Sequence, residues 1–247
     1  MPNERLKAAF LRSGLTPDDV APQLRVDPKT VERWITTERR PYRRHRYELG
    51  RILGEDETYL WPNALSPNQA AGASESEIIT VYPHRWTVPR DMWAHLFDAA
   101  EEEIGILVYS GLWLAEDAGM TSILRAKAEA GVNVRLLFGN PDSPEVISRG
   151  ESEKIGTSMP GKIRNALVLL RPLHEEVERI EVRTHRTVLY NSIYRSDDEL
   201  LANAHVYGFG ASQAPVLHLR RVAGGSMVTT YLESFERVWS QARPLDE

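Results

Sequence analysis

Polar side chains recur at every second position in two predicted strands within residues 190–207. Because successive side chains of a strand point to opposite faces, alternate residues share a face. Two such sets are predicted: Tyr190, Ser192 and Tyr194 on the first strand, and Asn203, His205 and Tyr207 on the second. A buried polar group costs free energy unless a partner satisfies it. Each of these residues alone could be a hydrogen-bonded core side chain, but the cluster indicates a ligand site.

Other side chains could line the same pocket. Tyr109 and Trp113 come at the end of a predicted core strand, which is where α/β sheets bind ligands. Arg149 and Arg164 flank a glycine-containing segment and could each pair with an anionic ligand. Each arginine could equally be a solvated surface residue. A small-molecule effector is therefore expected, and the sequence does not specify its identity.

A metal site is not expected in this segment. His185 and His205 are the only pair of histidines near it, and no carboxylate or thiolate stands at ligand spacing. The chain contains no cysteine, which excludes disulfides, thiolate metal sites and thiol redox chemistry. We therefore expect neither a metal nor another cofactor.

The spacing within residues 190–207 resembles the signature of the phospholipase D family, His-x-Lys-x4-Asp followed, six residues later, by Gly-Ser-x-Asn. Asp197 matches the aspartate of that signature, and Tyr190 and Ser192 stand at the histidine and lysine positions. The second half of the signature is replaced throughout, by Ala204, His205 and Tyr207. The resemblance covers roughly residues 78–241 and implies a phospholipase D-like α/β domain.

In that family the histidine is the nucleophile and the lysine holds the phosphate. Tyr190 stays protonated at neutral pH because a tyrosine pKa is near 10. Ser192 supplies no positive charge to a phosphorane. We therefore expect no catalytic residue and no enzymatic activity, and a pocket that binds a ligand through the residues named above, including Asp197 and Asn203. A divergent phosphodiesterase or nuclease is the alternative.

Two short helices joined by a turn are predicted near the N-terminus. Thr16 and Asp27 can each cap a helix, and a proline follows each of them. In the second helix Val31, Trp34 and Ile35 have the spacing of one buried stripe. The opposite face carries polar side chains: Lys29, Thr30, Glu32, Arg33 and Thr36. This arrangement suits a helix that reads the DNA major groove, although amphipathic helix pairs also occur in many other all-α domains.

The charge of residues 25–51 favours the interpretation of these helices as a DNA-binding domain. Residues 25–51 contain nine basic and four acidic residues, whereas the whole chain has a formal net charge of −5. Such a positive region is typical of a surface that binds the phosphate backbone. No run of apolar residues is long enough to cross a membrane, and the charged N-terminus is unlike a signal peptide, so a cytoplasmic protein is expected.

Residues 2–62 resemble the lambda-repressor-like (XRE-type) helix-turn-helix domain, most closely in the turn 24–27 and the helix segment 30–34. The chain departs from many relatives where Glu38, Arg39 and Arg40 replace a glycine after the second helix. The resemblance implies five helices and DNA contacts. The predicted base readers are Lys29 and Arg33, and the other predicted DNA-binding residues are Thr30, Thr36, Arg39, Arg40, Arg43 and Arg44.

The chain is predicted to have two domains, at residues 1–62 and 78–247. Residues 63–77 are small and polar, which predicts a flexible linker. Strand and helix patterns alternate after residue 78 and predict an α/β domain with a largely parallel sheet. The predicted strands are 78–82, 103–114, 132–138, 181–194, 199–209 and 216–221, and the predicted helices are 89–100, 121–130, 162–180 with a possible break at Pro172, and 230–241.

These features together predict a DNA-binding transcriptional regulator whose catalytically inactive, phospholipase D-like domain senses a small effector. A homodimer would pair two half-sites and present two heads to a palindromic double-stranded operator. Besides the enzyme alternative, a ligand-free autoregulator of the antitoxin type remains open. Turnover of a diester would favour the enzyme, and a pocket lined only by apolar atoms would favour the autoregulator.

Overall fold

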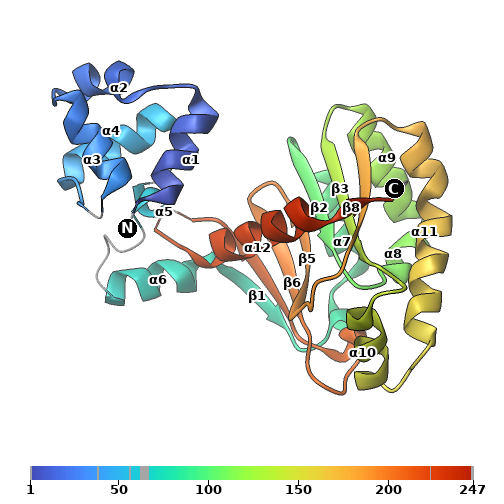
Figure 1. Cartoon of the computed structure of the whole chain (residues 1–247). Coiled ribbons are helices and arrows are strands. Elements are labelled where there is room, and N and C mark those ends of the chain that lie inside the picture. Colours follow the sequence, from blue (N-terminus) through green and yellow to red (C-terminus); the bar gives the residue numbers. More distant parts are fainter. Residues whose placement is uncertain (1, 38, 56, 62–66, 223, 246–247) are drawn as a thin grey trace. The chain divides into compact units, whose positions relative to one another are not determined.

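The computed structural model describes residues 2–37, 39–55, 57–61, 67–222 and 224–245. The chain divides into two compact units (Figure 1). We call residues 1–77 with 221–229 the N-terminal unit, and residues 78–220 with 230–247 the α/β unit. Among the described residues, no helix combines the length and the apolar character needed to span a lipid bilayer.

The N-terminal unit begins with five helices, and the first four start or end at a recognisable local signal. Their bounds are α1 (Glu4–Ser13), α2 (Pro17–Leu24), α3 (Pro28–Thr36), α4 (Arg43–Leu53) and α5 (Glu57–Leu60). Thr16 and Asp19 form a reciprocal capping box at the start of α2. Arg25 ends that helix with a left-handed φ of 54°, and Asp27 caps α3 by accepting the Lys29 N–H at 2.9 Å. A tight turn between α2 and α3 results.

The core of these helices is small and apolar. Its buried side chains include Leu6, Val20, Val31, Trp34 and Leu49. Trp34 of α3 also lies against His45 of α4, with ring centroids 5.7 Å apart. The stripe predicted at positions 31, 34 and 35 is therefore the inner face of α3, with Ile35 only partly buried. The opposite, polar face of α3 is left to solvent.

The segment predicted as a flexible linker is largely helical. Residues 63–66 lie outside the described residues, but α6 spans Pro67–Glu77. The prediction of a fully flexible segment was wrong because alanine, glutamine and glutamate favour a helix when its end is anchored. Glu77 supplies that anchor: it is buried, and its carboxylate accepts the backbone N–H groups of Met227 at 2.8 Å and Val228 at 3.0 Å.

The α/β unit is built on one mixed sheet of eight strands in the order β1-β7-β6-β5-β2-β3-β4-β8. Only β2–β3 and β3–β4 are parallel pairs, and the other five pairs are antiparallel. The strands are β1 (Ile78–Tyr82), β2 (Glu103–Leu107), β3 (Asn133–Gly139), β4 (Ile180–His185), β5 (Asn191–Ser196), β6 (Glu199–Ala204), β7 (Val216–Arg220) and β8 (Arg243–Pro244).

The prediction of a largely parallel sheet was wrong because the second half of the domain is a meander. Asp197, with φ of 50°, turns β5 directly back into β6, a conformation that aspartate tolerates. The single strand predicted at 181–194 is two strands, β4 and β5, which lie on opposite sides of the β2–β3 pair. Residues 186–190 contain no glycine or proline, so the sequence has no signal that shows where β4 ends.

Helices cover both faces of the sheet (Figure 1). They are α7 (Arg90–Asp98), α8 (Leu112–Ala115), α9 (Ala118–Glu129), α10 (Pro144–Ser152), α11 (Ser158–Glu176) and α12 (Met227–Gln241), with short 3-10 turns η2 (Arg85–Thr87) and η3 (Ala211–Gln213). On one face, Phe235 of α12 lies beneath the guanidinium of Arg135. On the other, Trp93 of α7 meets Tyr194 of β5 edge-on at 4.8 Å. Helix α11 continues through Pro172 without the predicted break.

Candidate functional site

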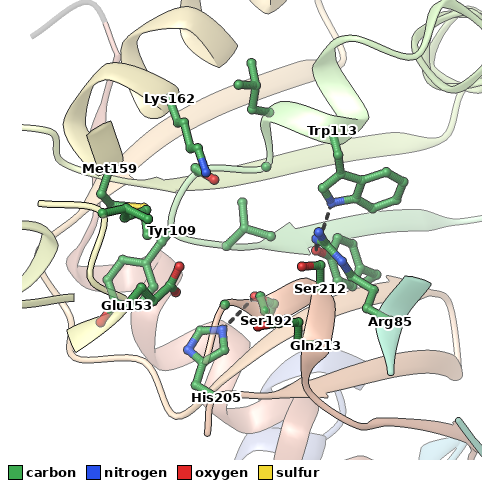
Figure 2. Close-up of a pocket in the computed structure, with 18 of the residues that line it drawn as sticks. Arg85, Tyr109, Trp113, Glu153, Met159, Lys162, Ser192, His205, Ser212 and Gln213 are labelled. Carbon is green, nitrogen blue, oxygen red and sulfur yellow. Dashed lines mark hydrogen bonds between the residues drawn. The ribbon is translucent and has the colours of Figure 1, made fainter. Parts of the chain in front are cut away.

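A polar cavity of about 440 Å³ lies in the α/β unit (Figure 2). One wall is the segment 108–113 that follows β2, and another comes from α10, α11 and their connection through Glu153, Met159 and Lys162. The floor includes Ser192 and Tyr194 of β5. His205 and residues 210–213 complete the lining. The cavity therefore collects side chains from segments that are far apart in the sequence.

A serine and a histidine form the most specific contact in this cavity. Ser192 Oγ lies 3.0 Å from Nε2 of His205, and Nδ1 of His205 lies 3.1 Å from the carbonyl oxygen of Leu189. A carbonyl oxygen can only accept, so Nδ1 carries the ring proton of the neutral imidazole. Nε2 is then the acceptor, and the Ser192 hydroxyl donates to it. The backbone thus fixes the tautomer of His205.

The surroundings keep His205 neutral. Burial lowers its pKa to about 4, and the positive charges of Arg149 and Arg85 act in the same direction, while the bond to Leu189 opposes them. The ring also stacks on Tyr109, with centroids 5.6 Å apart. Tyr109 is held in turn, because its hydroxyl accepts the Leu189 N–H at 3.0 Å. At neutral pH the imidazole is therefore an unprotonated acceptor in a fixed orientation.

Two cationic side chains face the cavity. The Arg85 guanidinium lies over the Trp113 ring at 5.0 Å and donates to the Tyr194 hydroxyl at 3.3 Å. Figure 2 shows Lys162 pointing from α11 toward the cavity, from the side opposite Ser192 and His205. Within the described part of the chain, no ion-pair partner is found for either cation. Together they make the cavity suitable for an anionic group.

The structure brings together only part of the predicted ligand-binding set. Tyr109, Trp113, Ser192 and His205 line the cavity. Arg149 lies behind Tyr109, where it pairs with Glu153 at 2.6 Å. The cavity wall therefore presents Glu153 already neutralised by Arg149.

The remaining predicted residues lie elsewhere. Tyr190 and Tyr207 are 81% and 87% exposed and do not line the cavity. Arg164 pairs on the surface with Asp142 at 2.6 Å. Strand alternation placed both tyrosines beside the site, but each lies just beyond the end of its strand, where alternation no longer fixes direction.

The side chains of Asn203 and Asp197 form hydrogen bonds with the backbone and stabilise the fold. Asn203 is buried and donates to the carbonyl oxygens of Ala214 and Pro215 at 3.2 and 3.1 Å. The carboxylate of Asp197 accepts the backbone N–H groups of Glu101, Glu102 and Glu103 at 2.7, 3.0 and 2.7 Å. It therefore joins the β5–β6 turn to the start of β2 and does not face the cavity.

Sequence reasoning missed two cavity residues, Arg85 and Lys162. Arg85 belongs to the short turn η2, and Lys162 is an exposed residue of a long amphipathic helix. The one lining residue close to either of them in sequence is Met159, an apolar side chain three positions before Lys162. The sequence therefore contains no local pattern that distinguishes these two cations from other surface cations.

In the N-terminal unit, the residues predicted to contact DNA lie on and after α3. Their exposure is compatible with a ligand as large as a duplex, because all but the half-buried Thr30 are exposed. No ion pair is found among the described residues for Lys29, Arg33, Arg39, Arg40 or Arg43. By contrast, nearby Arg51 pairs with Glu48 at 3.2 Å. Glu38, which was part of the predicted departure from the family pattern, lies outside the described residues. The result is a group of exposed cations, which we call the α3 cation face.

Comparisons with known proteins give structural matches only. No protein-family model and no curated protein matches this sequence. Similar solved structures include Nuc from Salmonella typhimurium, a phospholipase D family member, with 15% identity and a TM-score of 0.37 over 63% of this chain and 89% of Nuc. A second is TrmBL2, an archaeal chromatin protein with a novel mode of DNA binding, with 13% identity and a TM-score of 0.42 over 82% of this chain and 62% of that protein. A third is phosphatidylserine synthase from Haemophilus influenzae, with 11% identity and a TM-score of 0.42 over 85% of this chain and 48% of the synthase.

The similar structures include a phospholipase D family member and a phosphatidylserine synthase, and the expectation that this chain has no enzymatic activity is not retained. That expectation rested on Tyr190 and Ser192 standing where one family has histidine and lysine. It considered only these two positions, whereas Ser192 lies within hydrogen-bond distance of His205 in the folded domain. The expectation of an inactive domain is therefore withdrawn.

Proposed function

We propose that the protein is a sequence-specific DNA-binding regulator of transcription whose α/β unit binds a phosphate-bearing ligand. In this proposal the N-terminal unit inserts α3 into the major groove of an operator. The observation that carries the proposal is the α3 cation face, because exposed cations that have no carboxylate partner among the described residues attract the phosphate backbone. The cavity of the α/β unit receives the anionic group of the ligand.

The arrangement of α3 supports the role of its exposed face. Val31 and Trp34 are buried, so the helix is fixed by its inner face and presents a constant set of outer side chains. Lys29 and Arg33 lie four residues apart, one turn of helix, and both are exposed. Arginine can donate two hydrogen bonds to one guanine edge. Arg33 is therefore the proposed base reader, and Arg39, Arg40 and Arg43 are proposed phosphate contacts.

The ligand proposal rests on the charges of the cavity. Its lining contains two cations, Lys162 and Arg85, and two carboxylates, Glu116 and Glu153, of which Glu153 is paired with Arg149. A phosphate group suits cations that can donate several hydrogen bonds. We further propose a homodimer, in which two N-terminal units would match the two half-sites of a palindromic operator.

Quantitative DNA binding tests the proposal. A duplex selected from a random pool by the full chain would be compared with an unrelated duplex over a range of salt concentrations. We expect Arg33→Ala to weaken binding to the selected duplex by about 1–3 kcal/mol and to change binding to the unrelated duplex little. Arg43→Ala should weaken both and reduce the slope of log affinity against log salt by about one.

A matched control uses an arginine of the α/β unit. Arg171 is exposed on α11, and its pair with Glu175 is long, at 3.7 Å. Arg171→Ala should leave both affinities unchanged. The assignment of the α3 cation face would be refuted if the wild-type chain showed no salt-dependent DNA binding, or if Arg171→Ala weakened binding as much as Arg43→Ala does.

A further inference from the structure

The contact between Ser192 and His205 has the geometry of a nucleophile and its general base. The Oγ to Nε2 distance of 3.0 Å is within the range of a strong hydrogen bond. Because Nδ1 is engaged with the Leu189 carbonyl oxygen, Nε2 is free to take the serine proton. In such sites a third group orients the base, and here the backbone carbonyl has that position.

The surrounding fold holds both side chains in place. Ser192 lies in β5 between two antiparallel neighbours, β2 and β6. It is only 3% exposed, yet it lines the cavity. His205 stacks on Tyr109, and its backbone N–H donates to the Tyr190 carbonyl oxygen at 2.9 Å. The hydroxyl and the imidazole are thus preorganised at the wall of a cavity that a substrate can enter.

Burial lowers the pKa of His205 to about 4, so the ring is unprotonated at neutral pH but is a weaker base than an imidazole whose pKa is near 7. A general base must be deprotonated before it can accept a proton. The positive charge of Arg85 near the ring contributes to this state and is also available to an anion in the cavity. Burial is the main reason that the base is neutral, and the positive charge of Arg85, which adds to this effect, also favours a negatively charged substrate.

We propose that Ser192 is a nucleophile activated by His205, and that the cavity hydrolyses a phosphodiester. The proposal rests on the phosphate-bearing ligand of the proposed function, and it makes that ligand a substrate. Lys162 and Arg85 stabilise the charge that grows on the phosphoryl oxygens during attack. Lys162 projects toward the cavity from the side opposite the serine, so the proposed nucleophile and this cation face the cavity from opposite walls (Figure 2).

The chemistry proceeds in two balanced steps. Ser192 Oγ forms a bond to phosphorus, its proton passes to Nε2 of His205, and the bond from phosphorus to the leaving oxygen breaks. The leaving oxygen takes the proton from His205 and departs as an alcohol. Water then attacks the phosphoserine, its proton passes to His205, and Ser192 Oγ leaves and regains that proton. One diester and one water give one monoester and one alcohol.

Turnover of bis(4-nitrophenyl) phosphate by the full chain tests the proposal. We expect measurable release of nitrophenolate by the wild type and loss of activity in Ser192→Ala. His205→Phe keeps an aromatic ring on Tyr109 but removes the base, and should lower kcat by about 10²–10⁴-fold. The matched controls are Ser122→Ala and His95→Phe, because both residues are exposed on helices outside the cavity. Both should retain wild-type turnover.

Covalent trapping separates a nucleophilic serine from one that only satisfies a buried histidine. Diisopropyl fluorophosphate should phosphorylate Ser192 with loss of fluoride, detected as a mass increase on the peptide that contains residue 192. Labelling should fall sharply in His205→Phe, with circular dichroism confirming that the variant is folded. Labelling of another residue instead, or turnover that survives Ser192→Ala, would overturn the assignment.

Calorimetric titration with inorganic phosphate separates this inference from the proposed function. If the wild type binds phosphate but neither hydrolyses the diester nor is labelled, the Ser192–His205 pair is structural, the inference is wrong and the phosphate-binding proposal stands. If phosphate does not bind at all and the diester is not cleaved, both proposals for the cavity fail. The DNA-binding proposal is tested separately by the duplex titrations.

Discussion

The polar side chains of the α3 cation face and those of the cavity in the α/β unit differ in exposure and in the number of their partners. On the α3 cation face, Arg33 and Arg43 are exposed and have no ion-pair partner among the described residues. In the cavity, His205 and Tyr109 each have specific partners at both ends of the side chain. Exposed, unpartnered cations suit a large ligand recognised by its charge. Oriented, partly buried groups suit a small ligand recognised by its shape and chemistry.

Most cations inside the sheet of the α/β unit are already neutralised, which sharpens this contrast. Arg135 of β3 donates to Glu103 at 2.8 Å and to Glu236 at 2.9 Å. Arg195 of β5 contacts the same two carboxylates, at 2.9 and 3.2 Å. These four groups form a network on the α12 face of the sheet. These arginines are therefore not available to bind an anionic ligand. Lys162 in the cavity has no ion-pair partner among the described residues and is available.

The largest effect is expected from Trp34→Ala, which tests whether the two units have independent cores. Trp34 is 4% exposed within the N-terminal apolar cluster. Removing a buried tryptophan should lower the free energy of unfolding of that unit by about 3–5 kcal/mol. Denaturant titration followed by amide hydrogen exchange in each unit measures this. The α/β unit should keep its protection.

Trp86→Ala is the matched control, because Trp86 is 74% exposed and should change stability by less than about 0.5 kcal/mol. Simultaneous loss of exchange protection in both units of Trp34→Ala would show that the units unfold as one and would break the comparison.

Lowering the pH should have a smaller effect on stability. It should destabilise the α/β unit because His185 becomes protonated on unfolding. Burial lowers the pKa of His185 to about 4, although its bond to Val108 and the charge of Glu145 oppose the shift. The folded pKa lies below the unfolded value of 6.5, so the unfolded state binds the proton first as pH falls. Stability is fully present above pH 6.5 and declines toward pH 4, by about 3 kcal/mol from this residue.

Denaturant titrations at several pH values between 7 and 4 measure that decline. His205 also has a pKa lowered to about 4 and contributes its own part of the decline. His185→Asn should therefore make the decline shallower without abolishing it, at the expense of lower stability at neutral pH because the bond to Val108 changes. His95→Asn, at an exposed site, should leave the pH dependence unchanged. An equally steep decline in His185→Asn would assign the acid sensitivity to other groups.

The smallest effect is expected from Arg164→Ala, which separates surface cations from the cations of the cavity. The pair with Asp142 is exposed on both sides, so its loss should change the free energy of unfolding by less than about 1 kcal/mol. Phosphate affinity, measured by calorimetry, should stay at the wild-type level. Lys162→Ala should reduce that affinity. An equal reduction in Arg164→Ala would extend the site beyond the lining that we describe.

The sequence by itself determined features that depend on neighbouring residues. Thr16 and Asp27 predict the starts of α2 and α3 because a cap acts within three residues of itself. The buried stripe at Val31 and Trp34 follows from the helical period alone. The concentration of cations between residues 25 and 51 is likewise a property of composition. The use of that surface in DNA binding stays a prediction.

Only the tertiary structure decided which strands are neighbours and which side chains meet. Alternation predicts which face of its strand Ser192 lies on. It does not predict that His205, which follows the end of β6, contacts Ser192 on that face. The β5–β6 turn at Asp197 makes the sheet mixed, because antiparallel pairing needs only a tight turn whereas parallel pairing needs a crossover. Arg85 and Lys162, 77 positions apart, enter one cavity through long-range packing. Such convergence depends on the free energy of the whole fold, and no local pattern encodes it.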